Sequence, residues 1–210
     1  MPRLGLRLPS FPYMSRFTHH PFLLFLRVMM KNPLSVCALT PSSRILARAM
    51  ARGLEIRPNE SVMELGPGTG ALTDQIRHIL PNDDGYIGIE LEQRFVHLLK
   101  DRFPSLRFEH DTVTRAFQVH ADSGVPPVKA VISGLSISTM PVPVIDEIIG
   151  NLDRLLGPGS VFRMFQYVHA YCLPSAVRFR RRMTPLFSDY RCETIVVRNL
   201  PPALVLTWTR

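Results

Sequence analysis

The sequence predicts an α/β fold, a doubly wound and mostly parallel sheet of seven strands with helices on both faces. Three observations lead to this expectation. Strand-like and helix-like segments alternate from residue 61 onward, a glycine-rich bend joins the first of each, and the last two strand-like segments follow each other directly. The chain has 210 residues, of which 46% are apolar and 20% charged, so it can form one globular domain with an appendage.

Each of the first strands is expected to lead into a helix. The expected strands are 61–65, 85–91, 106–111, 129–135 and 160–169, and the expected helices are 71–80, 92–103, 113–121 and 142–156. Because parallel neighbours need a crossover connection, this rhythm favours a parallel sheet. Residues 192–200 and 203–210 flank Pro201 and Pro202, and we expect them to form an antiparallel pair, joined by a tight turn, at the sheet edge.

Basic side chains are concentrated at the N-terminal end of the chain. The formal net charge is +8, and the first 54 residues contain eight basic residues and no acidic one. This asymmetry indicates an arm, residues 1–54, that meets an anionic surface, either nucleic acid or acidic lipid. A second basic cluster is expected on a helix within 173–187, either as a solvated face or as a phosphate contact; it consists of Arg178, Arg180, Arg181 and Arg182.

The arm contains an apolar segment, residues 21–32, that is too short to span a bilayer, which needs roughly 20 apolar residues. An apolar helix with basic residues and no acidic neighbours favours a position in the membrane interface, and packing on the domain's own sheet is the alternative. Pro41, Ser42 and Ser43 form a helix-start signal, and the helix that follows ends at Gly53. We expect this second helix to be a lid on the domain formed by residues 55–210.

Three glycines, Gly66, Gly68 and Gly70, occupy every second position between the first strand and its helix. Glycine allows a sharp turn and lets a ligand approach the backbone, and the helix N-terminus beyond offers unpaired N–H groups. Glu90 closes the second strand, where its carboxylate can accept hydrogen bonds from both hydroxyls of a ribose. The pattern therefore predicts a nucleoside-containing cofactor.

Two cofactor classes use this layout. Dinucleotide sites prefer G-x-G-x-x-G, whereas this chain has E-x-G-x-G-x-G beginning at Glu64. The second form resembles motif I of the class I S-adenosylmethionine-dependent methyltransferases, whose sheet also ends in a reversed strand. The resemblance implies a Rossmann-like methyltransferase fold, with S-adenosylmethionine as cofactor and S-adenosylhomocysteine as product. A dinucleotide oxidoreductase and a non-catalytic nucleotide binder are the alternatives.

The resemblance also implies which residues contact the cofactor. In that family the glycine loop holds the methionine part, the acid after strand two holds the ribose, the residue after strand three meets the adenine amino group, and the segment after strand four lies beside the transferred methyl. The implied residues are Glu64, Leu65, Gly66, Pro67, Gly68, Thr69, Gly70, Glu90, Asp111, Ser133, Gly134 and Leu135. For Asp111, an N-cap of the next helix is the alternative.

Longer resemblances suggest the methyl acceptor. Strand one resembles the ribosomal RNA adenine dimethylases, but strand four continues as VISGLSISTMP and lacks the [DN]-P-P-[YF] tetrad with which adenine N6-methyltransferases hold a base. Five stretches in order resemble the bacterial phospholipid N-methyltransferases of the rhizobial type, over about residues 22–210. They are FLRVMMKNPLSVCALTPSSRILARAMA, VMELGPGTGALT, AVISGLSISTMP, FRMFQYVHAYCLP and VVRNLPPALVLTWTR.

This resemblance implies N-methylation of the amine headgroup of a membrane lipid, namely phosphatidylethanolamine and its methylated derivatives towards phosphatidylcholine. Tyr167 matches the family's tyrosine on strand five and is the candidate catalytic residue, to bind the amine or relay its proton; simple packing at the sheet end is the alternative. Ser42 and Ser43 lie at a junction that covers the cofactor in that family, so they join the implied cofactor-binding residues.

The implied partners are the lipid substrate and an anionic membrane surface, with the protein cytoplasmic and peripheral on the inner face of the cell membrane. Neither nucleic acid nor metal is expected as a partner. Cys37, Cys172 and Cys192 do not have the spacing of metal ligands, so we expect them to be reduced thiols. The alternatives are an RNA adenine N6-dimethyltransferase-like enzyme, an ornithine-lipid N-methyltransferase, a small-molecule methyltransferase and an inactive cofactor-binding protein.

Overall fold

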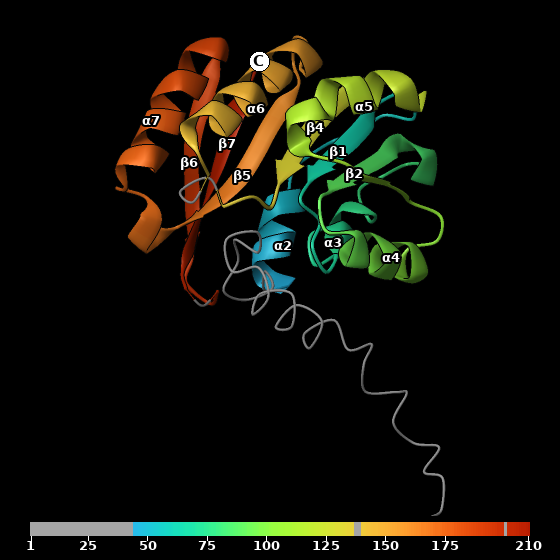
Figure 1. The fold of residues 1–210 in the computed structure, drawn as a ribbon. Helices are drawn as coiled ribbons and strands as arrows, with labels where there is room; N and C mark the ends of the chain where they lie inside the picture. The colour runs from blue at the N-terminus through green and yellow to red at the C-terminus, as the bar shows by residue number, and fades with distance from the viewer. Residues whose placement is uncertain (1–43, 137–139, 200) are drawn as a thin grey trace, which may run out of the picture.

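The computed structural model describes residues 44–136, 140–199 and 201–210. Over these residues the chain forms a sheet in the order β3-β2-β1-β4-β5-β7-β6, with helices on both faces (Figure 1). The strands are β1 (Ser61–Leu65), β2 (Tyr86–Glu90), β3 (Arg107–His110), β4 (Val128–Ser133), β5 (Val161–Tyr167), β6 (Asp189–Val196) and β7 (Ala203–Thr209). The helices are α2 (Arg44–Ala51), α3 (Thr73–Ile76), α4 (Gln93–Arg102), α5 (Ala116–Ser123), α6 (Val142–Leu155) and α7 (Pro174–Met183).

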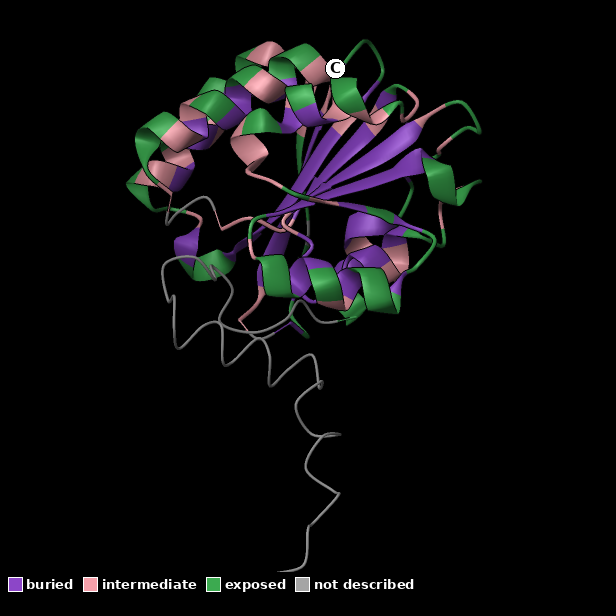
Figure 2. Ribbon diagram, turned by 45° about the vertical axis from the view of Figure 1, so that its right-hand side comes forward, coloured by how far each residue is buried: buried purple, intermediate pink, exposed green. Residues whose placement is uncertain are grey.

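The predicted doubly wound sheet is confirmed. β1 to β5 pair in parallel, and β7 is antiparallel to both β5 and β6. The central strands are buried on both faces, while the helices outside them present exposed residues to solvent (Figure 2). Burial on both faces explains why these strands read as almost continuous apolar runs.

Neighbouring residues of β1 belong to different layers of the core. Val62 packs with Leu46 of α2 and Leu99 of α4 on one face. Met63 packs with Ile148 of α6 on the other face. This alternation follows from the two-residue period of a strand, and it places α2, α3 and α4 opposite α5, α6 and α7.

The helix predicted after Pro41 is present as α2, whose apolar face is packed into the core. Leu46 and Met50 are fully buried. The interfacial helix expected within residues 21–32, the rest of the arm, Ser42 and Ser43 lie outside the described residues. None of the helices in the described ranges is both long enough and apolar enough to cross a membrane.

Some of the expected element boundaries are wrong. The helix expected over 71–80 is regular only in α3, because the bonds from His78 N to Gln75 O and from Ile79 N to Ile76 O tighten the chain ahead of Pro81. β5 ends at Tyr167 and continues as a 3₁₀ turn. β6 and β7 are joined by residues 197–202 rather than by a tight turn.

Candidate active site

The carboxyl ends of the parallel strands meet at one edge of the sheet, which places the predicted site residues together. The loop after β1 is tied to both neighbouring strands: Gly66 N donates to Ile89 O at 3.0 Å, and Gly134 N donates to Leu65 O at 2.9 Å. Backbone of β2 and of the segment after β4 therefore fixes where the loop starts. This edge is also where ligands bind in open α/β sheets.

The glycine loop needs its glycines for conformation and for space. Their φ angles are positive: Gly66 70°, Gly68 58° and Gly70 82°. A Cβ on Gly66 would lie 2.7 Å from Leu135 Cδ2, and one on Gly134 would lie 2.7 Å from Gly66 O. At Gly68, by contrast, no described atom outside Gly68 and its two chain neighbours lies within 4 Å of the Cβ position, so the crest of the loop has room for a ligand.

Glu90 joins the loop to the end of β2. Its Oε2 accepts a hydrogen bond from Gly68 N at 2.8 Å, and its Oε1 accepts one from Glu92 N at 2.9 Å. Burial raises the pKa of the Glu90 carboxyl, and the backbone N–H donors act in the opposite direction. The side chain is 8% exposed, and each oxygen keeps a lone pair with which it can accept a ribose hydroxyl.

Glu64 lies beneath the same loop and is fully buried. Its Oε2 accepts hydrogen bonds from Tyr86 Oη at 2.6 Å and from Thr73 Oγ1 at 2.7 Å. Its Oε1 has no hydrogen-bond partner among the described residues. Burial raises the pKa of Glu64 to about 7, against the opposing effect of the two hydroxyl donors. A buried oxygen without a partner is costly, so a cationic or N–H group from a ligand would fit there.

The next two predicted residues are engaged locally. Asp111 Oδ1 accepts from Thr112 N at 2.7 Å, and its Oδ2 accepts from Arg115 Nη1 at 2.8 Å. The N-cap of the following turn is Thr112, whose hydroxyl accepts from Thr114 N, so the alternative role for Asp111 is taken by its neighbour. Ser133 is buried, and its hydroxyl accepts from Leu135 N at 3.2 Å.

Tyr167 is the last residue of β5, at the same edge of the sheet, and is 8% exposed. Its ring stacks on the exposed His169 ring at 5.7 Å and meets Phe165 edge-on at 5.5 Å. It pairs with Ala203 of β7 across the antiparallel ladder. Both rings therefore fix the orientation of this side chain.

Sequence reasoning missed the groups that support the loop from below. Tyr86 and Thr73 hold Glu64, and Arg102 Nη1 donates to Thr69 O at 2.8 Å from the end of α4. A tyrosine that starts a strand and an arginine that ends a helix are ordinary at those positions. Only the folded arrangement brings them to the loop.

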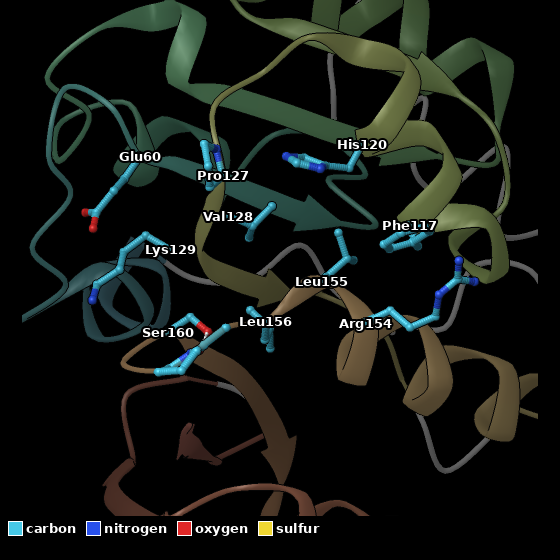
Figure 3. A pocket seen from close by; sticks show the side chains of 12 residues that line it. Glu60, Phe117, His120, Pro127, Val128, Lys129, Arg154, Leu155, Leu156 and Ser160 are labelled. Carbon is cyan, nitrogen blue, oxygen red and sulfur yellow. Dashed lines mark hydrogen bonds between the residues drawn. The ribbon is translucent and has the colours of Figure 1, made fainter.

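A separate pocket of about 500 Å³ lies at the amino ends of the strands, away from the glycine loop (Figure 3). Its basic side chains are already engaged: Lys129 Nζ donates to Gly159 O at 2.6 Å, and Arg154 lies 3.7 Å above the centre of the Phe117 ring. No motif singled out in the sequence reaches this pocket. It is therefore not the predicted cofactor site.

Two of the comparisons with known proteins match the part of the chain that contains the predicted cofactor-binding residues. The family model for ribosomal RNA adenine dimethylase matches residues 42–114, which include the glycine loop, Glu90 and Asp111. The ribosomal RNA small subunit methyltransferase A of Prosthecochloris aestuarii is 26% identical over 130 residues, 61% of this chain and 46% of that protein. The chain thus spans less than half the length of that relative.

One relative matches nearly the whole chain. The ornithine lipid N-methyltransferase of Singulisphaera acidiphila is 29% identical over 189 residues, 87% of this chain and 92% of that protein. Among solved structures, the N-methyltransferase NodS from Bradyrhizobium japonicum, in complex with S-adenosyl-L-homocysteine, has a TM-score of 0.56 at 11% identity, and covers 80% of this chain and 84% of its own. The chain is thus a methyltransferase of the class I fold, with S-adenosylmethionine as its cofactor.

Proposed function

We propose that the protein transfers a methyl group from S-adenosylmethionine to the amine of a membrane-lipid headgroup. The extent of the two matches carries this proposal. The ribosomal RNA family model ends at residue 114, before β4 and β5, whereas the lipid N-methyltransferase of Singulisphaera acidiphila aligns over 87% of the chain. Similarity to the lipid enzyme therefore includes the half in which the acceptor is expected.

Phosphatidylethanolamine, with its methylated derivatives towards phosphatidylcholine, and ornithine lipid are the two headgroups we propose. Both present an amine at the bilayer surface. The basic arm, residues 1–54, would hold the protein on anionic lipid at the inner face of the cell membrane, since each basic residue near such a surface contributes about 1 kcal/mol.

The cofactor contacts follow from the geometry of the loop. Glu90 would accept the ribose hydroxyls, the open crest at Gly68 would lie against the methionine part, and the free oxygen of Glu64 would face its cationic end. Asp111 makes two hydrogen bonds, which leaves lone pairs for the adenine amino group. Ser42 and Ser43 would cover the nucleoside from the start of α2.

When bound, S-adenosylmethionine supplies an electrophilic methyl group, so the chain mainly has to align a neutral amine with it and exclude water. Tyr167, at the end of β5, would bind the amine or relay its proton where the acceptor reaches this edge of the sheet, and its aromatic ring would tolerate a methylated ammonium. The stacked His169 holds that ring in place. An aromatic face tolerates one, two or three methyl groups, which suits repeated transfer.

The experiment that tests this proposal gives the full chain labelled S-adenosylmethionine with vesicles that contain phosphatidylethanolamine and ornithine lipid, and separately with ribosomal RNA. Label is expected in a lipid, with transfer reduced about tenfold or more by Tyr167→Phe and unchanged by Tyr190→Phe. Tyr190 is the control because it packs on Trp208 at the other end of the hairpin.

RNA adenine dimethylation is the second candidate, because the family model for that activity matches residues 42–114. Exposed arginines on α7, Arg178 and Arg181, would then contact phosphates. Label that enters RNA and no lipid would replace the lipid proposal with this one.

A further inference from the structure

Exposed apolar side chains gather at the edge of the sheet that holds the candidate site. Leu91 follows β2, Val142 begins α6 after β4, and Val168 follows β5. In the part of the chain that the structure describes, every large apolar residue with high exposure lies at or beside this edge. These are Ile45, Leu91, Val142, Val168, Leu173, Ile195 and Val197.

Three of these residues lie at or beside the connection between β6 and β7, and we call them the hairpin patch: Val168, Ile195 and Val197. Val168 N donates to Pro202 O at 2.9 Å, which joins the turn after β5 to the hairpin. Val197 is 68% exposed and Ile195 is 46% exposed. In Figure 1 the hairpin and α2 lie together at the lower end of the molecule, opposite the C-terminus.

The backbone holds these side chains outward. The β6–β7 register shifts between Cys192 and Ile195, so one strand carries an additional residue there. Such a bulge bends the strand and changes the direction of the side chains that follow. Asn199, which is buried, donates through its side-chain amide to Pro201 O at 2.7 Å and stiffens the hairpin. Val197 therefore projects from a fixed hairpin.

Charge around the patch favours an anionic partner. Arg198 follows Val197, is exposed, and forms no ion pair with a described residue. Arg44, at the start of α2, is also exposed and forms none with a described residue. Four acidic side chains near this edge are each paired with an arginine: Glu92 with Arg94, Asp111 with Arg115, Asp146 with Arg182, and Glu193 with Arg163. Exposed apolar side chains beside cations that have no acidic partner among the described residues favour binding to an anionic bilayer surface.

We propose that the hairpin patch and Arg198 form a membrane-contact surface of the folded domain, in addition to the arm, and insert into the headgroup region of an anionic bilayer. This inference rests on the proposed function for its purpose. Ala203 of β7 pairs with Tyr167 of β5 on one side and with Val196 of β6 on the other. Membrane contact at the hairpin would therefore bring Tyr167, the candidate catalytic residue, to the level of the lipid headgroups.

The test replaces two exposed side chains in the full chain. Ile195→Thr/Val197→Thr keeps the branch at Cβ but replaces one apolar branch of each side chain by a hydroxyl, and Ile195→Leu/Val197→Leu is the apolar control. Flotation with phosphatidylglycerol-containing vesicles is expected to show binding at least about tenfold weaker for the threonine pair only, since about 1.4 kcal/mol of lost burial has this effect. Affinity for S-adenosylhomocysteine and methyl transfer to detergent-dispersed lipid are expected to stay unchanged.

A second measurement does not depend on how well that pair folds. Trp208 is fully buried, so its emission should not change when vesicles are added. A change in the emission of a Val197→Trp variant would therefore report the tip of the hairpin. A blue shift on addition of phosphatidylglycerol vesicles supports the proposal. Arg198→Ser is expected to weaken vesicle binding at low salt, and Arg57→Ser, exposed before β1 at the opposite edge, is not.

Wild-type vesicle binding by the threonine pair together with an unshifted tryptophan emission would overturn the proposal. A wild-type protein that is a dimer in solution and a threonine pair that is a monomer would also overturn it, because a second copy of the chain would then cover the patch. Loss of vesicle binding in the threonine pair, with no lipid methylated by the wild-type protein in any form, would keep the contact surface and refute the proposed function instead.

Discussion

The two buried carboxylates at the glycine loop, Glu90 and Glu64, differ in their hydrogen-bond partners. Glu90 is held by two backbone N–H groups and keeps lone pairs towards the open edge. Glu64 is fully buried and is held by Tyr86 and Thr73 on one oxygen only. Glu90 can therefore accept hydrogen bonds from a ligand. Glu64 has one oxygen for which the described residues supply no hydrogen-bond donor.

Glu90→Gln is expected to weaken S-adenosylhomocysteine binding by about 10- to 100-fold, because hydrogen bonds to a charged group contribute roughly 1.5–3 kcal/mol. The amide would also place its NH2 group against one of the two backbone donors, Gly68 N or Glu92 N. Isothermal titration calorimetry measures the change. Glu109→Gln on β3, whose partner is the exposed Arg107, is the control, and equal affinity in both variants would contradict the assignment of Glu90.

Glu64 predicts a pH dependence of stability. Its pKa is about 7 in the folded protein against 4.5 as the reference value, so the folded state binds the proton more tightly. Between these pH values the unfolded chain binds fewer protons, and the free energy of unfolding falls as pH rises, by at most about 3 kcal/mol. Glu64→Gln removes this titration. Urea unfolding should therefore show that the free energy of unfolding of the variant rises relative to that of the wild type from pH 4.5 to 7.5. A difference that stays constant with pH would contradict this cause.

At the scale of elements, a buried arginine fixes α2 to the sheet. Arg163 lies in the middle of β5, is 6% exposed, and donates through Nη1 to Met50 O at 3.2 Å and to Arg52 O at 2.7 Å. Those carbonyls belong to the C-terminal end of α2, which lacks intrahelical partners for them. Thr207 and Glu193 orient the guanidinium from β7 and β6. The helix that follows the arm is thus locked to the strand that ends in Tyr167.

Arg163→Met is expected to lower the free energy of unfolding by about 2–3 kcal/mol, because it leaves the buried Met50 carbonyl and the partly buried Arg52 carbonyl without this donor. Limited proteolysis should then cut first within residues 44–57, since α2 loses its attachment. Arg191→Met is the control, because Arg191 is 73% exposed and its pair with Asp189 contributes little. An unchanged cleavage pattern would show that apolar packing alone holds α2.

The elements with a strong period were predictable from the sequence, and those shaped by neighbours were not. β1 and β2 are buried on both faces, so their mainly apolar sequences predict strands. The three spaced glycines predict the loop between β1 and its helix. The short α3 was not predictable, because the loop uses residues up to Leu72 before the helix begins. Arg163 reads as an interruption of an apolar strand, and only the position of α2 explains it.

The whole molecule separates its two ends. Loop, acids, Tyr167 and exposed apolar residues lie at the carboxyl edge, while the pocket of Figure 3 lies at the amino edge beside Lys129 and Arg154. A parallel sheet imposes this separation, because every crossover returns the chain to the same starting edge. The sequence predicted the cofactor edge from its motif, but not the apolar rim, because Ile195 and Val197 look like ordinary strand residues.

A crystal structure of the full chain with S-adenosylhomocysteine tests the central claim most directly. We expect the ribose hydroxyls within hydrogen-bond distance of Glu90 and the homocysteine part against Gly66, Gly68 and Gly134. A nucleoside bound in the pocket at the amino edge, with the glycine loop free of ligand, would contradict the assignment of the site.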